Sequence, residues 1–166
     1  MKATILSGVA ALVLVASPAM ALDVERFGGL VDKTLAAIDE GDVNIQELLG
    51  YQDQLIEIGI SGAHTFGEAN AEFAETMTFI AANTDQMKAL NLEEIEVEWH
   101  SRGAMEAAGL DVEAFDEDDD AVNHMEAIVH PATAHIALRA YEVTGDDAYL
   151  EQVVDELTEI MDHLAE

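Results

Sequence analysis

The sequence contains no cysteine among its 166 residues. Disulfide bonds, iron–sulfur clusters, covalently attached c-type haem and zinc sites made of thiolates are therefore excluded, because each of them requires cysteine sulfur. The stability of a domain without disulfides or metal clusters depends on the burial of apolar side chains. Half of the residues are hydrophobic, so the chain is able to form a sizeable core.

Proline and aromatic residues are also scarce. The chain has two prolines, and aromatic residues make up 5% of it. Runs of β-branched residues are short, and alanine is abundant, which favours helices over sheet. No stretch alternates between apolar and polar residues over a useful length, so we expect no strands.

Basic residues are few. Six lysines and arginines stand against 35 acidic residues, for a formal net charge of −29. This negative charge repels phosphate backbones and anionic lipid headgroups. It therefore argues against nucleic acid and against an anionic membrane surface as partners. It favours cations and basic proteins as partners. High solubility is the plainer interpretation of the same charge.

Residues 1–21 have the pattern of a cleaved secretory signal peptide. An apolar run at residues 3–16 follows Lys2, and small residues precede the expected cleavage after Ala21. The run is too short to span a bilayer. We therefore expect a periplasmic protein whose mature domain comprises residues 22–166.

Apolar residues recur at three- and four-residue steps through most of the mature chain, which predicts amphipathic helices. Five or six helices of about 15 to 25 residues with short links indicate a single antiparallel helical bundle, in the all-α class. Gly59, Gly62 and Gly67 follow one another near the end of the second predicted helix. We interpret them as the end of that helix, and space for a close helix or a ligand is the alternative.

The stretch at residues 120–141 is expected to be the central helix of the bundle. It contains half of the six histidines and Pro131. Proline removes a backbone donor and clashes with the carbonyl four residues earlier, that of Ala127, so the helix should be kinked or broken there. Thr133 or a histidine is expected to supply a partner for the freed carbonyl.

Histidines are the main candidates for a binding site. Imidazole suits zinc, copper and iron, and Met125 could add a sulfur ligand for copper or for a b-type haem. His64 is expected to face inward on the second helix, and His100 follows Trp99 on the fourth. The predicted metal ligands are His64, His100, His124, His130 and His135, and the predicted cofactor-binding residues are Trp99 and Met125.

Recognised catalytic and metal-binding motifs are missing. There is no H-E-x-x-H or Glu-x-x-His ligand spacing, no nucleophile elbow, no P-loop and no dinucleotide fingerprint. Glu126 precedes His130 by four residues, and Glu96 precedes His100 in the same way. Such pairs can transfer protons if they are buried. The plainer interpretation is that the histidines bond to neighbouring carboxylates or backbone groups.

Three functions follow from these observations. The leading hypothesis is an exported, acidic, non-enzymatic bundle that binds a metal cation, a small ligand or a basic protein partner through a histidine-containing pocket. The alternative is a metal- or haem-dependent periplasmic protein with redox or hydrolytic activity. The third is a structural or assembly protein without a site.

Overall fold

The computed structural model describes residues 22–165, and every regular element in this range is helical. This confirms the predicted all-helical class. The predicted signal peptide at residues 1–21 lies outside the described residues. None of the described helices combines the length and the apolar character needed to cross a membrane.

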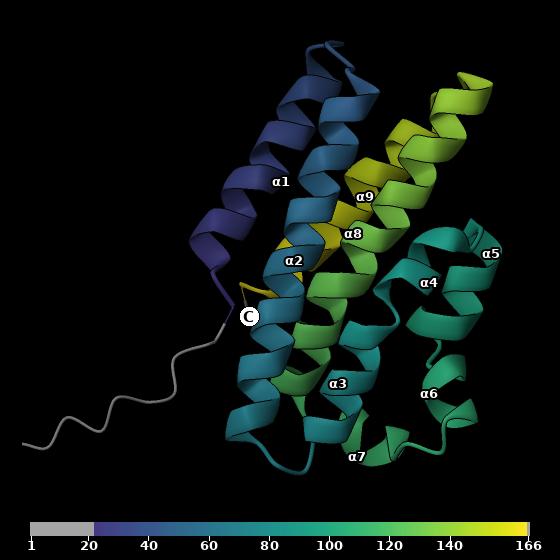
Figure 1. The fold of residues 1–166 in the computed structure, drawn as a ribbon. Coiled ribbons are helices and arrows are strands. Elements are labelled where there is room, and N and C mark those ends of the chain that lie inside the picture. Colours follow the sequence, from purple (N-terminus) through teal and green to yellow (C-terminus); the bar gives the residue numbers. More distant parts are fainter. Residues whose placement is uncertain (1–21, 166) are drawn as a thin grey trace, which may run out of the picture.

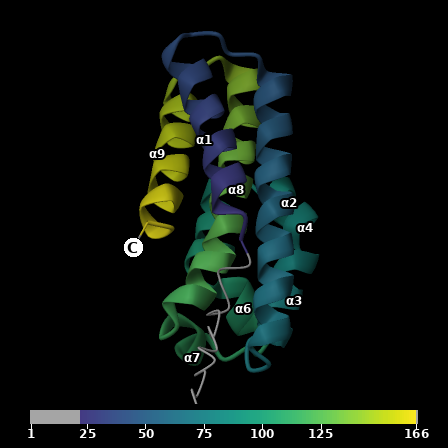
Figure 2. The ribbon, with the colours of Figure 1, turned by 90° about the vertical axis from the view of Figure 1, so that its left-hand side faces the viewer.

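Four long helices run alternately up and down (Figure 1). They are α1 (Val24–Asp39), α2 (Ile45–Ala69), α8 (Asp119–Thr144) and α9 (Ala148–His163). In the turned view, α1 lies in front of α8, with α9 and α2 on either side (Figure 2). Asp23, Asn44 and Asp118 cap the starts of α1, α2 and α8, where each side chain accepts a backbone hydrogen bond.

Short elements cover the lower halves of α2 and α8 (Figure 1). They are α3 (Ala74–Ala82), α4 (Thr84–Ala89), α5 (Leu92–Ile95), the π-helical turn η1 (Glu96–His100), α6 (Gly103–Ala107) and α7 (Val112–Asp116). The prediction of helices of about 15 to 25 residues is therefore wrong for this part of the chain. Residues that end or cap helices recur here every few positions, among them Asn91, which forms a capping box with Glu94.

Two hydrophobic cores result from this division. An aliphatic core joins the four long helices, and its members include Leu30, Leu55, Leu138, Val153 and Leu157. A Met-aromatic core joins α2 and α8 to the short elements, and its members include Met77, Met87, Trp99, Met105, Phe115 and Met125. Helix α8 contributes to both cores, which explains why nearly all of its middle residues are buried.

Helix α8 continues through Pro131 without interruption. The expected break is therefore wrong, and a bend at this position stays a prediction. The hydroxyl of Thr133 donates to the carbonyl of Val129 at 3.0 Å, not to that of Ala127. The Ala127 carbonyl instead faces α2, since a Cβ added at Gly59 would lie only 2.6 Å from its oxygen. The backbone of α2 thus packs against the carbonyl that lost its intrahelical donor.

The glycines of α2 have the role given by the alternative interpretation, space for close packing. The helix extends beyond all three of them, to Ala69, so their interpretation as a helix end is wrong. A Cβ at Gly62 would lie 3.0 Å from Leu22, and one at Gly67 would lie 3.2 Å from the backbone of Ala74. Each glycine costs a helix about 1 kcal/mol relative to alanine, and close packing against neighbouring segments offsets that cost.

Candidate metal centre

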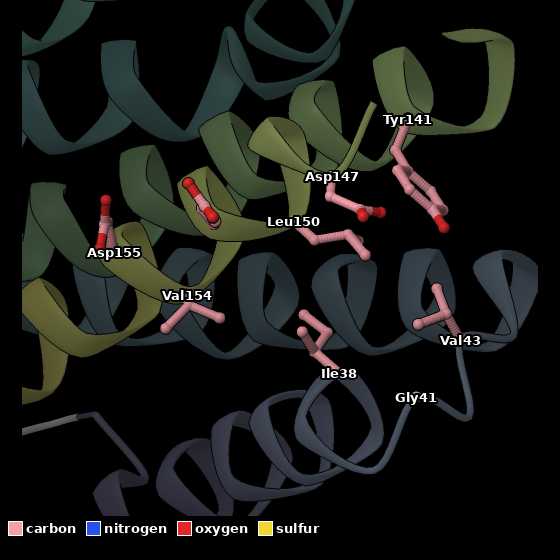
Figure 3. A pocket seen from close by; sticks show the side chains of 9 residues that line it. Ile38, Gly41, Val43, Tyr141, Asp147, Leu150, Val154 and Asp155 are labelled. Carbon is pink, nitrogen blue, oxygen red and sulfur yellow. The ribbon is translucent and has the colours of Figure 1, made fainter. Parts of the chain in front are cut away.

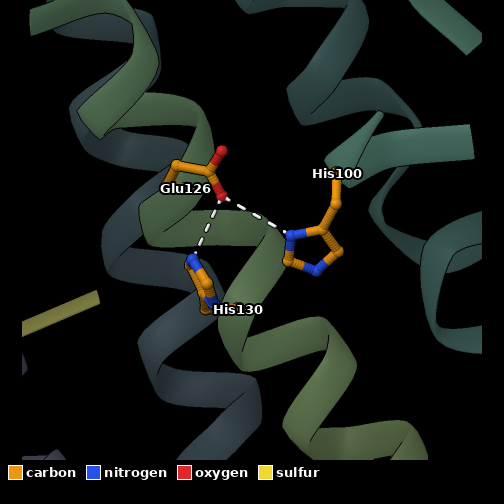
Figure 4. Close-up of side chains that lie close together, drawn as sticks. All are labelled: His100, Glu126 and His130. Carbon is orange, nitrogen blue, oxygen red and sulfur yellow. Dashed lines mark ion pairs between the residues drawn. The ribbon is translucent and has the colours of Figure 1, made fainter. Parts of the chain in front are cut away.

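Side chains from η1 and α8 converge between the two cores. His100 is the last residue of η1, and Glu126 and His130 lie one turn apart on α8. One ligand atom from each of the three lies within 4.8 Å of the others. Figure 4 shows the Glu126 carboxylate facing both imidazole rings. Among residues 22–165, this is the group of histidines and carboxylates whose geometry suits a metal ion.

His130 lies between two carboxylates. Its Nε2 is 3.2 Å from Glu126 Oε2, and its Nδ1 is 2.8 Å from Oε2 of Glu156, a residue of α9. The side chain is only 2% exposed. Because an ionised carboxylate only accepts hydrogen bonds, Nδ1 of His130 is the donor to Glu156. Its Nε2 is the nitrogen that faces Glu126 and His100.

The hydrogen bond of His100 fixes which of its nitrogens carries the proton. Its Nε2 lies 3.0 Å from Thr133 Oγ1, and the single hydroxyl hydrogen of Thr133 is directed to the Val129 carbonyl. Nε2 of a neutral His100 must therefore donate to Thr133. This leaves the lone pair of Nδ1 available, 3.9 Å from Glu126 Oε2.

Glu126 uses its two oxygens differently. Oε1 forms an ion pair with Arg102 Nη2 at 3.1 Å. Oε2 is buried and lies 3.2 Å from His130 Nε2 and 3.9 Å from His100 Nδ1. The protonated Nε2 of His130 is its cationic partner. A metal ion held between Oε2 and the two rings would take the place of that proton.

Charge and burial act in opposite directions on the two α8 residues. Burial alone would lower the pKa of His130, but the carboxylates of Glu126 and Glu156 raise this pKa to about 9. Burial would likewise raise the pKa of Glu126, but the hydrogen bond and charge of His130, together with Arg102 and His100, bring it below its ordinary value. At neutral pH the raised pKa makes His130 an imidazolium, which lies between Glu126 and Glu156.

Arg102 ties the end of η1 to α8. Its guanidinium donates to the carbonyls of His100 at 2.8 Å and Trp99 at 3.2 Å, besides binding Glu126. Its backbone has a φ of 64°, a left-handed conformation that is uncommon for residues other than glycine. Strain of this kind and π-helical turns both occur often at functional sites. Arg102 thus holds the segment that carries His100.

The other predicted histidines lie apart from this group. His64 is exposed on α2, so its predicted inward position is wrong, because the neighbouring Gly62 and Ala63 occupy the buried face. His124 is buried, donates to the Asp120 carbonyl at 2.7 Å and stacks on Phe66. His135 is buried elsewhere on α8, with Nδ1 3.7 Å from Asp53 Oδ1, and burial lowers its pKa.

Trp99 and Met125 are fully buried in the Met-aromatic core, where Trp99 stacks on Phe79. Neither belongs to the group of His100, Glu126 and His130, and their binding of a cofactor stays a prediction. Glu96 is exposed, and His100 pairs with Glu126 and Glu156 instead.

Sequence reasoning missed Arg102, Thr133 and Glu156 as parts of the site. A signal for Glu156 was present, because this residue lies beside Leu157 in the apolar stripe of α9 and is buried with it. The chain matches no protein-family model, no curated protein and no solved structure.

Proposed function

We propose that this protein binds a divalent transition-metal ion through His100 Nδ1, Glu126 Oε2 and His130 Nε2. Ligand atoms about 2.0–2.1 Å from a tetrahedral zinc ion lie about 3.4 Å from one another. The observed separations from Glu126 Oε2 are 3.2 Å to His130 and 3.9 Å to His100. All three atoms lie within 4.8 Å of one another, so a metal ion would draw the two histidine nitrogens closer together.

The outer contacts of the three ligands support this proposal most strongly. Metal-binding histidines usually donate their other ring N–H to a carboxylate or to another oxygen acceptor, which orients the ring. His130 does so to Glu156, and His100 does so to Thr133. Arg102 holds the remaining oxygen of Glu126. Each ligand is thus held by a partner at one atom, and its proposed coordinating atom lies within 4.8 Å of the other two.

The donor set favours particular metals. Two imidazoles and one carboxylate suit zinc, cobalt, nickel or copper(II), whereas magnesium and calcium prefer oxygen ligands alone. Three protein ligands leave at least one position for water or another ligand. The acidic surface would raise the local concentration of such cations. With export directed by residues 1–21, binding would take place in the periplasm.

Metal and proton compete for the same nitrogen. His130 Nε2 must lose its proton before it coordinates a metal, and the pKa of about 9 means that this proton is held at neutral pH. Metal binding should therefore release about one proton per ion near pH 7, and affinity should rise with pH. Calorimetry in two buffers that differ in ionisation enthalpy measures that proton directly.

Isothermal titration of the metal-free protein tests the proposal. We expect one zinc ion per chain, and at least about 100-fold weaker binding in His100→Gln, Glu126→Gln and His130→Gln. His64→Gln is the matched control, because His64 is an exposed histidine of the same chain, and it should bind as the wild type does. The proposal would be contradicted if zinc affinity fell equally in all four variants. It would also be contradicted if the folded wild type bound no stoichiometric zinc.

The other functions predicted from the sequence give different results. A b-type haem would show a visible absorption spectrum in protein isolated from its native compartment. A structural protein would bind neither haem nor a stoichiometric metal. The compact group of nitrogen and oxygen donors favours the single metal ion over both of these.

A further inference from the structure

A groove of about 760 Å³ is lined by the end of α1, the turn that follows it, α9 and one residue of α8, and none of the proposed metal ligands lines it. Ile38 at the end of α1, Val43 in the following turn, and Leu150 and Val154 of α9 supply its apolar lining. Figure 3 shows these side chains facing one another across the groove, with the Tyr141 ring of α8 at one end. The groove is therefore formed by three of the four long helices.

One wall of the groove is acidic. Asp147, Glu151 and Asp155 line it and are all exposed. Asp147 directly precedes α9, and Glu151 and Asp155 follow at four-residue steps, so the three lie on one face about 6 Å apart along the axis. No lysine or arginine lines the groove. In the described part of the chain, the ion pairs of lysine and arginine are formed with other carboxylates.

We propose that this groove docks a basic amphipathic helix of a partner protein. Such a helix lays its apolar face into a hydrophobic groove. Lysine or arginine at four-residue steps along one edge of that helix would repeat the 6 Å spacing of the α9 carboxylates. A second copy of this chain is a poor occupant, because two chains that each carry a formal charge of −29 repel each other. The inference does not rest on metal binding.

A synthetic helical peptide with leucine on one face and lysine at every fourth position of the adjacent edge is a suitable probe. Its binding is measured by fluorescence anisotropy at physiological ionic strength, where charges separated by more than about 8 Å are screened. A peptide of the same composition in scrambled order is the first control, because it keeps the charge and loses the amphipathic pattern. We expect the ordered peptide to bind and the scrambled one to bind at least about tenfold more weakly.

Two triple variants separate the groove from the general charge of the protein. Asp147→Asn with Glu151→Gln and Asp155→Asn should weaken binding about tenfold, since each exposed charge pair contributes a fraction of a kcal/mol. Glu68→Gln with Glu106→Gln and Glu113→Gln removes the same charge from exposed residues outside the groove and should change binding less than twofold. Val154→Asn, which leaves the charge unchanged, should also weaken binding.

Amide chemical shifts of the wild type provide a test that does not depend on variants. On addition of the ordered peptide, the shifts should change around Ile38, Val43 and Leu150. Equal weakening in the two triple variants, equal binding of the scrambled peptide, or shift changes elsewhere would each overturn the inference. Complete displacement of the peptide by a linear polyamine at equal concentration would also overturn it, in favour of a small cationic ligand.

Discussion

The region of the four long helices and the region of the short elements bury their apolar residues in different ways. The aliphatic core consists mainly of leucine, valine and isoleucine on helices of 16 to 26 residues. The Met-aromatic core contains four methionines, Trp99, Phe73 and Phe115, carried mostly by elements of nine residues or fewer. Methionine is flexible enough to fill the irregular spaces between such elements. The regular region therefore provides a frame, and the irregular region adapts to it.

The candidate metal centre depends on both regions. Glu126, His130 and Glu156 belong to long helices, whereas His100 and Arg102 come from η1 and the turn that follows it. A left-handed residue and a π-helical turn are tolerated here because the long helices hold the surrounding structure in place. Substitutions at the junction of the two regions should therefore lower stability more than similar substitutions in the regular region.

Removal of Glu126 should have the largest effect on stability. Glu126→Ala leaves His130 and Arg102 without one of their carboxylate partners inside the protein, and breaking a buried ion pair typically costs about 3–5 kcal/mol. Gln46→Ala is the control in the regular region, because it removes an exposed hydrogen bond to Glu142 and should cost about 0.5 kcal/mol or less. Chemical denaturation of both variants measures the free energies of unfolding, and similar losses would contradict the comparison.

Stability should fall as the pH rises from neutral to alkaline values. The folded pKa of His130, about 9, lies above the ordinary value of 6.5. Protonated His130 therefore stabilises the folded state by about 3 kcal/mol. This stabilisation is complete below pH 6.5 and is lost as the pH rises through 9. Denaturation curves of the metal-free protein at about pH 6 and pH 10 should show this loss. His130→Gln should abolish most of it, and His64→Gln should leave it unchanged.

Arg102 should strengthen metal binding although it is positively charged. Electrostatics alone predicts that Arg102→Gln binds cations more tightly, because a positive charge next to Glu126 is removed. If Arg102 instead positions η1 and Glu126, zinc affinity should fall about 10- to 100-fold, in Arg102→Lys as well as in Arg102→Gln. Arg139→Gln, at an exposed arginine of α8, is the matched control. Tighter binding in Arg102→Gln would refute the positioning role.

Two glycines of α2 should respond in opposite ways to the same substitution. Gly59→Ala places a Cβ 2.6 Å from the backbone oxygen of Ala127 and should destabilise the protein by about 1–3 kcal/mol. Gly50→Ala meets nothing within 4 Å and should stabilise it by about 0.5–1 kcal/mol, since alanine favours the helix. Thermal unfolding of the two variants measures the difference. Stabilisation in both cases would mean that α2 and α8 do not depend on the close contact at Gly59.

Prediction from the sequence succeeded where local periodicity decides the structure. The amphipathic pattern of the long helices and the i, i+4 relation of Glu126 and His130 are both properties of a single helix. Prediction failed for α2, whose three glycines pack against other segments instead of ending the helix. The predicted inward position of His64 was also wrong, because the segments packed against α2 determine which face of this helix is buried. In both cases the deciding contacts come from distant parts of the chain.

The sequence by itself determined the helical class, the strongly negative charge, the exclusion of cysteine chemistry and the pairing of Glu126 with His130, because composition and helical period are local properties. Only the tertiary structure decided that His100 joins this pair while His64, His124 and His135 do not. It also decided that Arg102, Thr133 and Glu156 orient the three side chains. The physical reason is that convergence depends on how separate elements pack, and the period of one helix carries no information about the position of another.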